Sequence, residues 1–269
     1  MNINNKTMIK LIFGIAMLVV PLCSIAQDYK IEFANNTANK IIVTASHGNF
    51  TINGYHGNEV RVKARNKEEH NTPEKAKGLK SLYNTADDNT GLGLSVVKEG
   101  NTLKILKATR HENDYEIEVP ENVSLSVDQV NWGEAKLEIN NVQGEIEISS
   151  TTGDIVLRNI SGPVVANSVS GNLTAEFSSI RQGKPTSISL VSGEIDLRMP
   201  SASKVDFKLQ SIAGEIYTDL DIVSKNKNAE QENLRQIGGG YTIQGATNGG
   251  GTEYSLNTVS GNIFIRKNP

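Results

Sequence analysis

Between Asn140 and Phe177 the sequence repeats one short phrase, in which a glycine recurs every nine residues and alternating apolar residues follow it. The four glycines are Gly144, Gly153, Gly162 and Gly171. Apolar residues at every second position are typical of a half-buried β-strand, whose side chains point alternately to its two faces. Strands this short cannot form a stable sheet alone, whereas similar strands at a fixed period bury one another by stacking. The repeat therefore restricts the chain to stacked β-structure.

The apolar positions of the repeat are expected to point into the protein, and the residues between them toward water. Two and four places after the four glycines stand Ile146, Ile148, Ile155, Leu157, Val164, Ala166, Leu173 and Ala175. The phrase recurs at wider spacing, and the matching positions there are Phe50, Ile52, Ile195, Leu197, Ile216, Ile263 and Ile265. The intervening residues are mostly polar, as the outer face of a half-buried strand requires.

These repeats predict an all-β, single-domain β-solenoid, or β-helix, of short stacked strands with glycine corners. Two phrases would make one coil of 18 residues, and the later gaps of 22 and 21 residues are interpreted as single coils with longer corners. Corners favour glycine where φ is positive or where a side chain would clash. The predicted corner glycines are Gly144, Gly153, Gly162, Gly171, Gly193, Gly214 and Gly261. An antiparallel β-sandwich is the alternative, although it gives less reason for one phrase to recur so closely.

Residues 1–26 are interpreted as a signal peptide that is cleaved after Ala26. Two lysines precede the apolar run LIFGIAMLVVPL and small residues follow it, which is the order typical of a secretory signal. The run is shorter than the roughly 20 residues of a membrane-spanning helix. Lipidation at Cys23 is disfavoured, because bacterial lipoproteins usually carry a small residue just before that cysteine and this chain has Leu22. The mature chain, residues 27–269, is expected to be one β-strand-repeat domain without a transmembrane segment.

Charge and cysteine content narrow the function. Removal of the signal peptide takes away two lysines and no acids, so the formal charge of −3 becomes −5. A mildly acidic chain lacks the basic stripe of a nucleic-acid-binding protein, so no nucleic-acid partner is expected. The single cysteine also lies in the signal peptide, so the exported chain would have neither a disulfide nor thiol chemistry. Its stability must come from burial and backbone pairing.

Five stretches of the chain also carry a family resemblance: GNFTINGYHGNEVRVKA, YEIEVPENVSLSV, GEIEI, GDIVL and GGGTEYSLNTVSGNIFIRK. Their order, from about Ile41 to Lys267, resembles that of the bacterial putative adhesin family, a domain of unknown function built from β-strand repeats. The resemblance implies an exported, envelope-associated β-helical protein. It implies no catalytic residue, because the family has none assigned.

The residues themselves predict no catalytic, metal or cofactor site. The chain has four histidines, His47, His56, His70 and His111. They form no HExxH pair, and no cysteine of the mature chain can join them in a zinc site. The glycine-rich stretch GGGYTIQGATNGGGT lacks both a GK[ST] ending and a GxGxxG pattern before a helix, so it is interpreted as a corner and not as a nucleotide loop.

Acidic residues follow several turn glycines, which raises the question of calcium binding. They are Glu134, Glu145, Asp154, Glu194 and Glu215. Calcium-binding β-rolls repeat several glycines and a regularly placed aspartate, whereas here only one glycine recurs. The series is also interrupted by Pro163, Asn172 and Asn262. We interpret these acids as solvated corner charges, because like charges stacked on neighbouring strands would repel and the interruptions relieve that repulsion.

Two acid–base pairs could serve a polysaccharide-active enzyme on a β-helix. They are Asp196 with Arg198 and Asp154 with Arg158. Such enzymes use a cluster of acids, or a basic residue beside an acid, on one outer face. Surface salt bridges explain the same pairs more simply, and that interpretation is favoured.

Outward-facing aromatic residues are the remaining candidate site. Tyr217 and Phe264 stand three places after their glycines, a position that is polar in several other copies. With Trp132 they could form a platform for stacking on a sugar or a partner protein. The favoured alternative is that the polar excursion SKNKNAEQENLRQ folds over them.

Together these features indicate an exported cell-envelope protein with a non-catalytic structural, adhesion or surface-binding role. It would reside in the periplasm, on the outer surface or in the medium, with a cell-surface glycan or an envelope protein as its partner. An envelope polysaccharide-active enzyme and a regulatory partner in the envelope stress response are the alternatives. A concave cluster of acids beside a deep groove would favour the enzyme.

Overall fold

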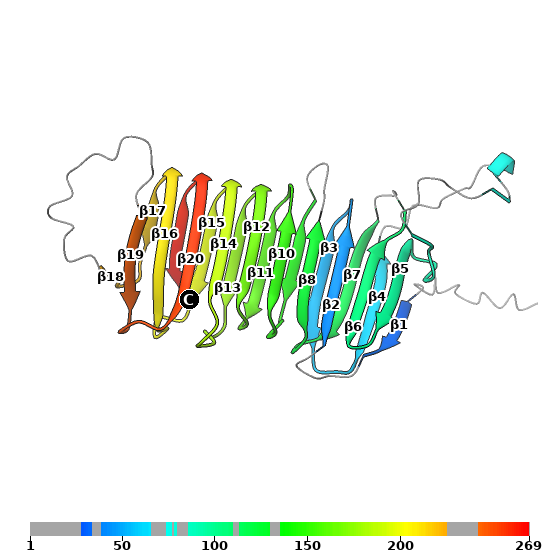
Figure 1. Ribbon diagram of the computed structural model, residues 1–269, viewed down its shortest axis with the longest axis horizontal. Helices are drawn as coiled ribbons and strands as arrows, with labels where there is room; N and C mark the ends of the chain where they lie inside the picture. The colour runs from blue at the N-terminus through cyan, green and yellow to red at the C-terminus, as the bar shows by residue number, and fades with distance from the viewer. Residues whose placement is uncertain are drawn as a thin grey trace, which may run out of the picture.

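The computed structural model describes residues 28–33, 39–65, 74–76, 78–79, 86–109, 113–129, 135–224 and 242–268. This part of the chain is an elongated stack of strands in two large sheets (Figure 1). The fold is all-β, as predicted, and the only helical element among the described residues is the short 3₁₀ turn η1 (Glu74–Ala76). Those residues contain no helix that is long and apolar enough to cross a membrane. The predicted signal peptide and Trp132 lie outside them.

The two sheets are called sheet A and sheet B, and their strands are given in spatial order. Sheet A contains β1 (Asp28–Glu32), β4 (Glu59–Arg65), β7 (Asp114–Pro120), β3 (Phe50–Tyr55), β9 (Leu137–Asn140), β11 (Ile155–Ile160), β13 (Leu173–Phe177), β15 (Ile195–Met199), β21 (Ile263–Lys267) and β17 (Ile216–Thr218). Sheet B contains β18 (Val223–Ser224), β19 (Thr242–Thr247), β16 (Val205–Ala213), β20 (Thr252–Ser260), β14 (Thr186–Ser192), β12 (Val164–Ser170), β10 (Ile146–Ser150), β8 (Ser124–Gln129), β2 (Lys40–Ala45), β6 (Thr102–Lys107) and β5 (Leu94–Glu99).

In the middle of the stack the chain alternates between the sheets, with β10, β12 and β14 in sheet B and β11, β13 and β15 in sheet A. Parallel pairing there joins residues 18 apart, so Ile146 lies opposite Val164 and Ile155 opposite Leu173. Two nine-residue phrases therefore place one strand in each sheet before the chain returns to the first. Antiparallel pairs occur toward the ends of the sheets, at β1–β4–β7, β5–β6 and β16–β19–β18.

The order of the last strands differs from the sequence prediction. We interpreted the 21 residues from Gly193 to Gly214 as a single coil. Instead, β20 lies between β14 and β16, and β21 lies between β15 and β17. The reason is the connection from β19 to β20, which crosses the end of β16. Its four residues, 248–251, can span roughly 14 Å, more than the roughly 10 Å across two strand spacings.

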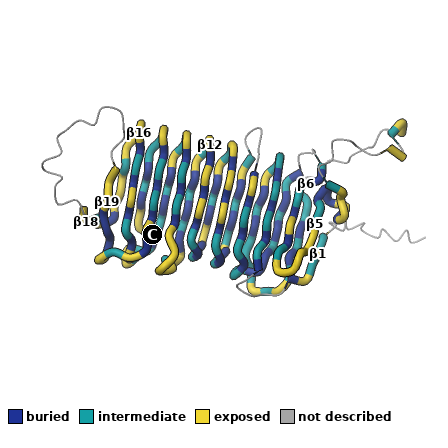
Figure 2. Tube along the Cα trace, in the orientation of Figure 1, coloured by how far each residue is buried: buried dark blue, intermediate teal, exposed yellow. Residues whose placement is uncertain are grey.

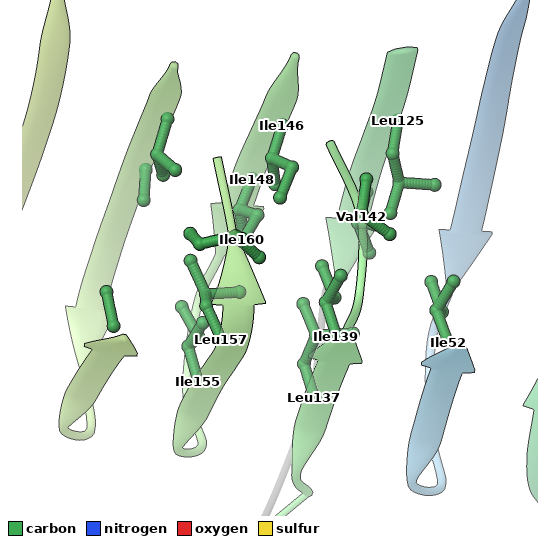
Figure 3. Packing of buried hydrophobic residues seen from close by; sticks show 14 of the residues in the cluster. Ile52, Leu125, Leu137, Ile139, Val142, Ile146, Ile148, Ile155, Leu157 and Ile160 are labelled. Carbon is green, nitrogen blue, oxygen red and sulfur yellow. The ribbon is translucent and has the colours of Figure 1, made fainter. Parts of the chain in front are cut away.

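The core is the layer of apolar side chains between the two sheets. All the inward positions predicted from the repeat are buried apart from Ile216, and burial alternates along the strands in the middle of the stack (Figure 2). Leu137 and Ile139 of β9 and Ile155 and Leu157 of β11 point toward the side chains of sheet B (Figure 3). Ile216 is half-buried because its strand, β17, is the edge of sheet A and has a neighbour on one side only.

The corner glycines lie where neighbouring coils come closest. A Cβ atom added to any of the seven predicted corner glycines would lie within 2.2 Å of a backbone carbonyl oxygen of the next coil. At Gly162 the close approach alone excludes a side chain, because its φ is not positive and the added Cβ would be 1.8 Å from the oxygen of Gly144. Gly153 has a positive φ of 105° in addition. The corners therefore require glycine mainly because the stacked backbones touch.

Candidate binding surface

The outer face of sheet A is covered by charged side chains that pair with one another. Glu138 lies between Lys136, whose Nζ is 3.1 Å from a carboxylate oxygen, and Arg158. Partial burial opposes ionisation of Glu138, but the hydrogen bond from Lys136 and the charge of Arg158 outweigh it and lower the pKa of the carboxyl. Further along the face, Arg61 pairs with Glu118. These groups are largely satisfied by one another.

The structure forms one of the two candidate acid–base pairs and not the other. Asp196 lies 3.3 Å from Arg198 and 3.3 Å from Arg266, so it is an ion-paired carboxylate on the sheet surface. Arg158 pairs with Glu138 and not with Asp154, because the parallel register brings β9 beside β11. Asp154 lines a corner hollow of about 640 Å³, in which it is the only carboxylate among the described lining residues.

Three of the five corner acids form a ladder with two asparagines on sheet A, whereas Glu145 pairs with Lys184 and Glu134 lies outside the described residues. In space the row reads Asp154, Asn172, Glu194, Asn262 and Glu215. A side-chain oxygen of Asp154, Asn172 and Asn262 each accepts the backbone N–H of the next residue in the row, at 2.9–3.0 Å. Each acid is thus separated from the next by an amide, which reduces their repulsion without an ion. Among the described residues no group of three or more potential ligands could hold a metal.

Asp88, in the loop before β5, uses its carboxylate to hold the backbone of that loop. Its carboxylate accepts N–H hydrogen bonds from Thr90, Gly91 and Gly93 at 2.9–3.0 Å. Burial alone would raise its pKa, but these hydrogen bonds outweigh burial and lower it. Asp88 therefore shapes the loop.

The predicted aromatic pair lies at one edge of sheet A. Tyr217 and Phe264 face each other across β17 and β21, with ring centroids 5.4 Å apart and planes 12° from parallel. The guanidinium of Arg266 lies 5.1 Å from the Phe264 centroid. Tyr217 is 51% exposed and Phe264 is half-buried. Trp132 and all but the first residue of the excursion predicted to cover the pair lie outside the described residues.

The outer face of sheet B carries an apolar row that the sequence analysis missed. Four aligned residues stand on adjacent strands in the order Val169, Val191, Val259 and Ile212. They are 45–53% exposed. In the sequence each stands two places before a repeated glycine, in SVSG, LVSG, TVSG and SIAG. This recurring β-branched residue at an outward position is the sequence feature from which the apolar row could have been predicted.

A polar row runs beside the apolar row, two residues earlier on each strand. Its members are Ser149, Asn167, Ser189, Asn257 and Gln210. The two rows line a groove of about 460 Å³, called here the sheet B groove. None of the thirteen described residues that line it is charged. Within the described structure, Asn257 donates to Ser255, whereas the other four side chains of the polar row make no hydrogen bond.

A family model described as Toastrack DUF4097 matches residues 24–266. A putative cell adhesion protein from Clostridium sporogenes is 12% identical, with 90% of this chain and 99% of that one covered at a TM-score of 0.47. A putative adhesin from Bacteroides fragilis is 11% identical, with 89% and 95% covered at 0.41. A putative lipid binding protein from Parabacteroides distasonis is 15% identical, with 88% and 95% covered at 0.27. Among curated proteins none matches the sequence significantly.

Proposed function

We propose, given that this chain belongs to the Toastrack DUF4097 family, that it is an exported, non-catalytic β-solenoid of the cell envelope that binds a surface partner. The membership confirms the resemblance drawn from the sequence, to an adhesin-like domain of unknown function. Residues 1–26 are the proposed signal peptide and residues 27–269 the proposed single domain. The alternation of strands between sheets A and B supports the solenoid.

The observation that carries a binding role is the contrast between the two outer faces. Most charged groups on the outer face of sheet A are paired with one another, and such pairs gain little from a further ligand. The sheet B groove instead presents four polar side chains without a hydrogen-bond partner in the described structure, beside half-exposed valines and isoleucine. Unpaired polar groups next to an exposed apolar surface are characteristic of interaction sites.

The enzyme alternative makes a specific demand on the two pockets. Glycoside hydrolysis commonly needs two carboxyl groups on either side of a sugar. The described lining of the sheet B groove has no carboxyl group, and that of the corner hollow contains Asp154 alone. A deep groove beside an acid cluster, the arrangement that would favour an enzyme, is not formed by these described residues.

Two measurements test the proposal. Intact-mass analysis of the exported protein should give a chain that begins near Gln27 without an acyl group, and acylation at Cys23 would replace the soluble form with a lipoprotein. Purified mature protein should also cosediment with envelope fragments of the source bacterium in a saturable manner. Retention of the intact chain in the cytoplasm, or failure to bind the fragments, would contradict the proposed function.

A further inference from the structure

The sheet B groove combines three properties that together point to one class of ligand. Its described lining is uncharged, offers both hydrogen-bond donors and acceptors, and carries an apolar strip beside them. We propose that the groove binds a neutral glycan chain lying along the stack, across strands β12, β14, β20 and β16. The inference rests on the proposed surface-binding function and names its partner.

The lack of charge in the described lining of the sheet B groove restricts the class of ligand. Charged residues make up 21% of the chain, yet none of the thirteen lining residues that the structure describes carries a charge. A ligand with phosphate, sulfate or carboxylate groups would find no cation in the described lining to balance its charge, whereas arginine and lysine are the usual partners of such groups. An anionic lipid surface is disfavoured for the same reason. A neutral ligand leaves no charge unpaired when it displaces water from the groove.

The polar row supplies the hydrogen bonds. Asn167 and Gln210 carry amides, which donate and accept, and Ser149 and Ser189 carry hydroxyl groups with the same dual capacity. None of these four side chains is hydrogen-bonded within the described structure. Sugar hydroxyl groups are likewise donors and acceptors, so they can pair with this row without a change in protonation.

The apolar row supplies the contact for the C–H faces of sugar rings. Val191 and Val259 are at its centre and are 51% and 45% exposed. Protein interfaces draw most of their energy from tryptophan, tyrosine and arginine, and none of these is among the described residues of the groove lining. The composition therefore favours a ligand that needs many modest polar contacts and a shallow apolar strip.

The direction of the rows favours a chain over a single sugar. Both rows cross the strands, so they run along the stack with a repeat of about 4.8 Å, the spacing of neighbouring strands. The four-residue apolar row from Val169 to Ile212 is then roughly 14 Å long. A longer oligosaccharide can contact more rungs than a disaccharide. Affinity should therefore rise with chain length until the rows are filled.

Calorimetric titration of the mature protein tests the inference with defined probes. Envelope polysaccharide of the source bacterium is separated by anion exchange into neutral and anionic fractions, and maltose, cellobiose, laminaribiose and chitobiose are compared with their hexasaccharides. We expect the neutral fraction to bind, and at least one hexasaccharide to bind about tenfold or more tightly than its disaccharide. Binding of the anionic fraction alone, or of no saccharide, would overturn the inference.

Matched variants locate the site. Val191→Asp places a charge in the groove and should weaken binding of the neutral fraction by about tenfold or more, and Ser189→Ala should weaken it severalfold. Val97→Asp is the control, because Val97 is also exposed, at 44%, but lies on β5 at the other end of sheet B. Thermal melts of all three should resemble that of the wild type. Equal weakening by Val191→Asp and Val97→Asp would refute the assignment to the groove.

Failure of this inference can be distinguished from failure of the proposed function. If envelope fragments bind and Val191→Asp abolishes that binding, but no saccharide binds, the surface-binding role holds and the glycan is wrong. Sedimentation velocity and vesicles of phosphatidylethanolamine with phosphatidylglycerol are included as probes. If the protein forms a dimer that Val191→Asp dissociates, the occupant of the groove is a second copy of the chain and not a glycan. If it binds vesicles and Val191→Asp abolishes that binding, the occupant is a lipid surface. Absence of binding to envelope fragments would remove both proposals.

Discussion

Replacing Ile155 by aspartate places a carboxyl group in the layer between the two sheets. Ile155 is 1% exposed and lies in register with Leu137 on β9 and Leu173 on β13. Asp154, the residue before it, points outward and accepts the Asn172 N–H at 2.9 Å. Two adjacent positions therefore have opposite environments, and the stacked register predicts opposite responses to substitution.

The cost of Ile155→Asp has two sources. Truncation of a buried isoleucine typically costs about 2–5 kcal/mol, through lost burial and the cavity that remains. The new carboxyl group has no polar partner among apolar neighbours and must stay protonated or disrupt the packing, which adds about 1–3 kcal/mol. We expect a total loss of about 4 kcal/mol or more. Asp154→Asn keeps the carbonyl acceptor for Asn172 and should cost less than about 0.5 kcal/mol.

Urea unfolding followed by circular dichroism measures both variants, with Ile155→Val as a control that should lose about 1 kcal/mol. The slopes of the unfolding free energy against urea must agree among the proteins, because stacked repeats can unfold in parts. Equal losses for the variants at positions 154 and 155, with equal slopes, would show that the inward and outward faces have been assigned wrongly.

Three further predictions concern the corners, the Asp88 loop and the aromatic pair. Gly162→Ala should lower the free energy of unfolding by about 3 kcal/mol or more, because its methyl group would overlap a backbone oxygen. Gly183→Ala, at an open site with positive φ, should lower it by about 1 kcal/mol. Similar urea midpoints for the two variants would contradict this difference. The pKa of Asp88 is lower in the folded state than in the unfolded state. Its carboxylate therefore stabilises the fold above the unfolded pKa of about 4, and this stabilisation disappears as the pH falls through the folded-state pKa. On acidification the melting temperature of Asp88→Asn should fall less than that of the wild type, and parallel pH profiles of the two proteins would argue against this role. Tyr217→Ala combined with Phe264→Ala should lower the free energy of unfolding by about 1–2 kcal/mol, because the two rings stack but Tyr217 is half-exposed. The double substitution should leave binding to envelope fragments unchanged. An unchanged melting temperature with lost binding would instead place the binding surface at this aromatic pair.

The sequence predicted the parts of the fold that depend on local pattern. Alternation along a strand is set by the backbone itself, so Ile146, Leu157 and Leu173 could be assigned to the core without knowledge of their neighbours. The fixed interval of nine residues also predicted which strands pair in the middle of the stack. The position of β20 between β14 and β16 could not be predicted, because similar strands offer similar partners and the choice depends on a crossing connection.

The candidate surface was harder to find from the sequence. Val191, Ile212 and Val259 share one place in the repeat, but only the strand order shows that they form one row, because Val259 is far away in the chain. Tyr217 and Phe264 were found because both occupy the same place in the repeat, and they do lie together in the structure. The roles of Trp132 and of the excursion stay predictions, since they fall outside the described residues apart from Ser224.

The placement of β20 and β21 has a consequence for how the chain assembles if it is exported as proposed. Strands β14 and β16 share no direct pairing, and neither do β15 and β17, so both pairs are joined only through residues beyond position 251. A chain that crosses the membrane from its N-terminus can complete the coils up to β15 as they emerge. Strands β16 and β17 then lack the neighbours that separate them from β14 and β15 until β20 and β21 have emerged. We therefore expect refolding to show an early phase for the first coils and a later one in which the last coil is inserted, with nascent β16 exposed to proteases between the two.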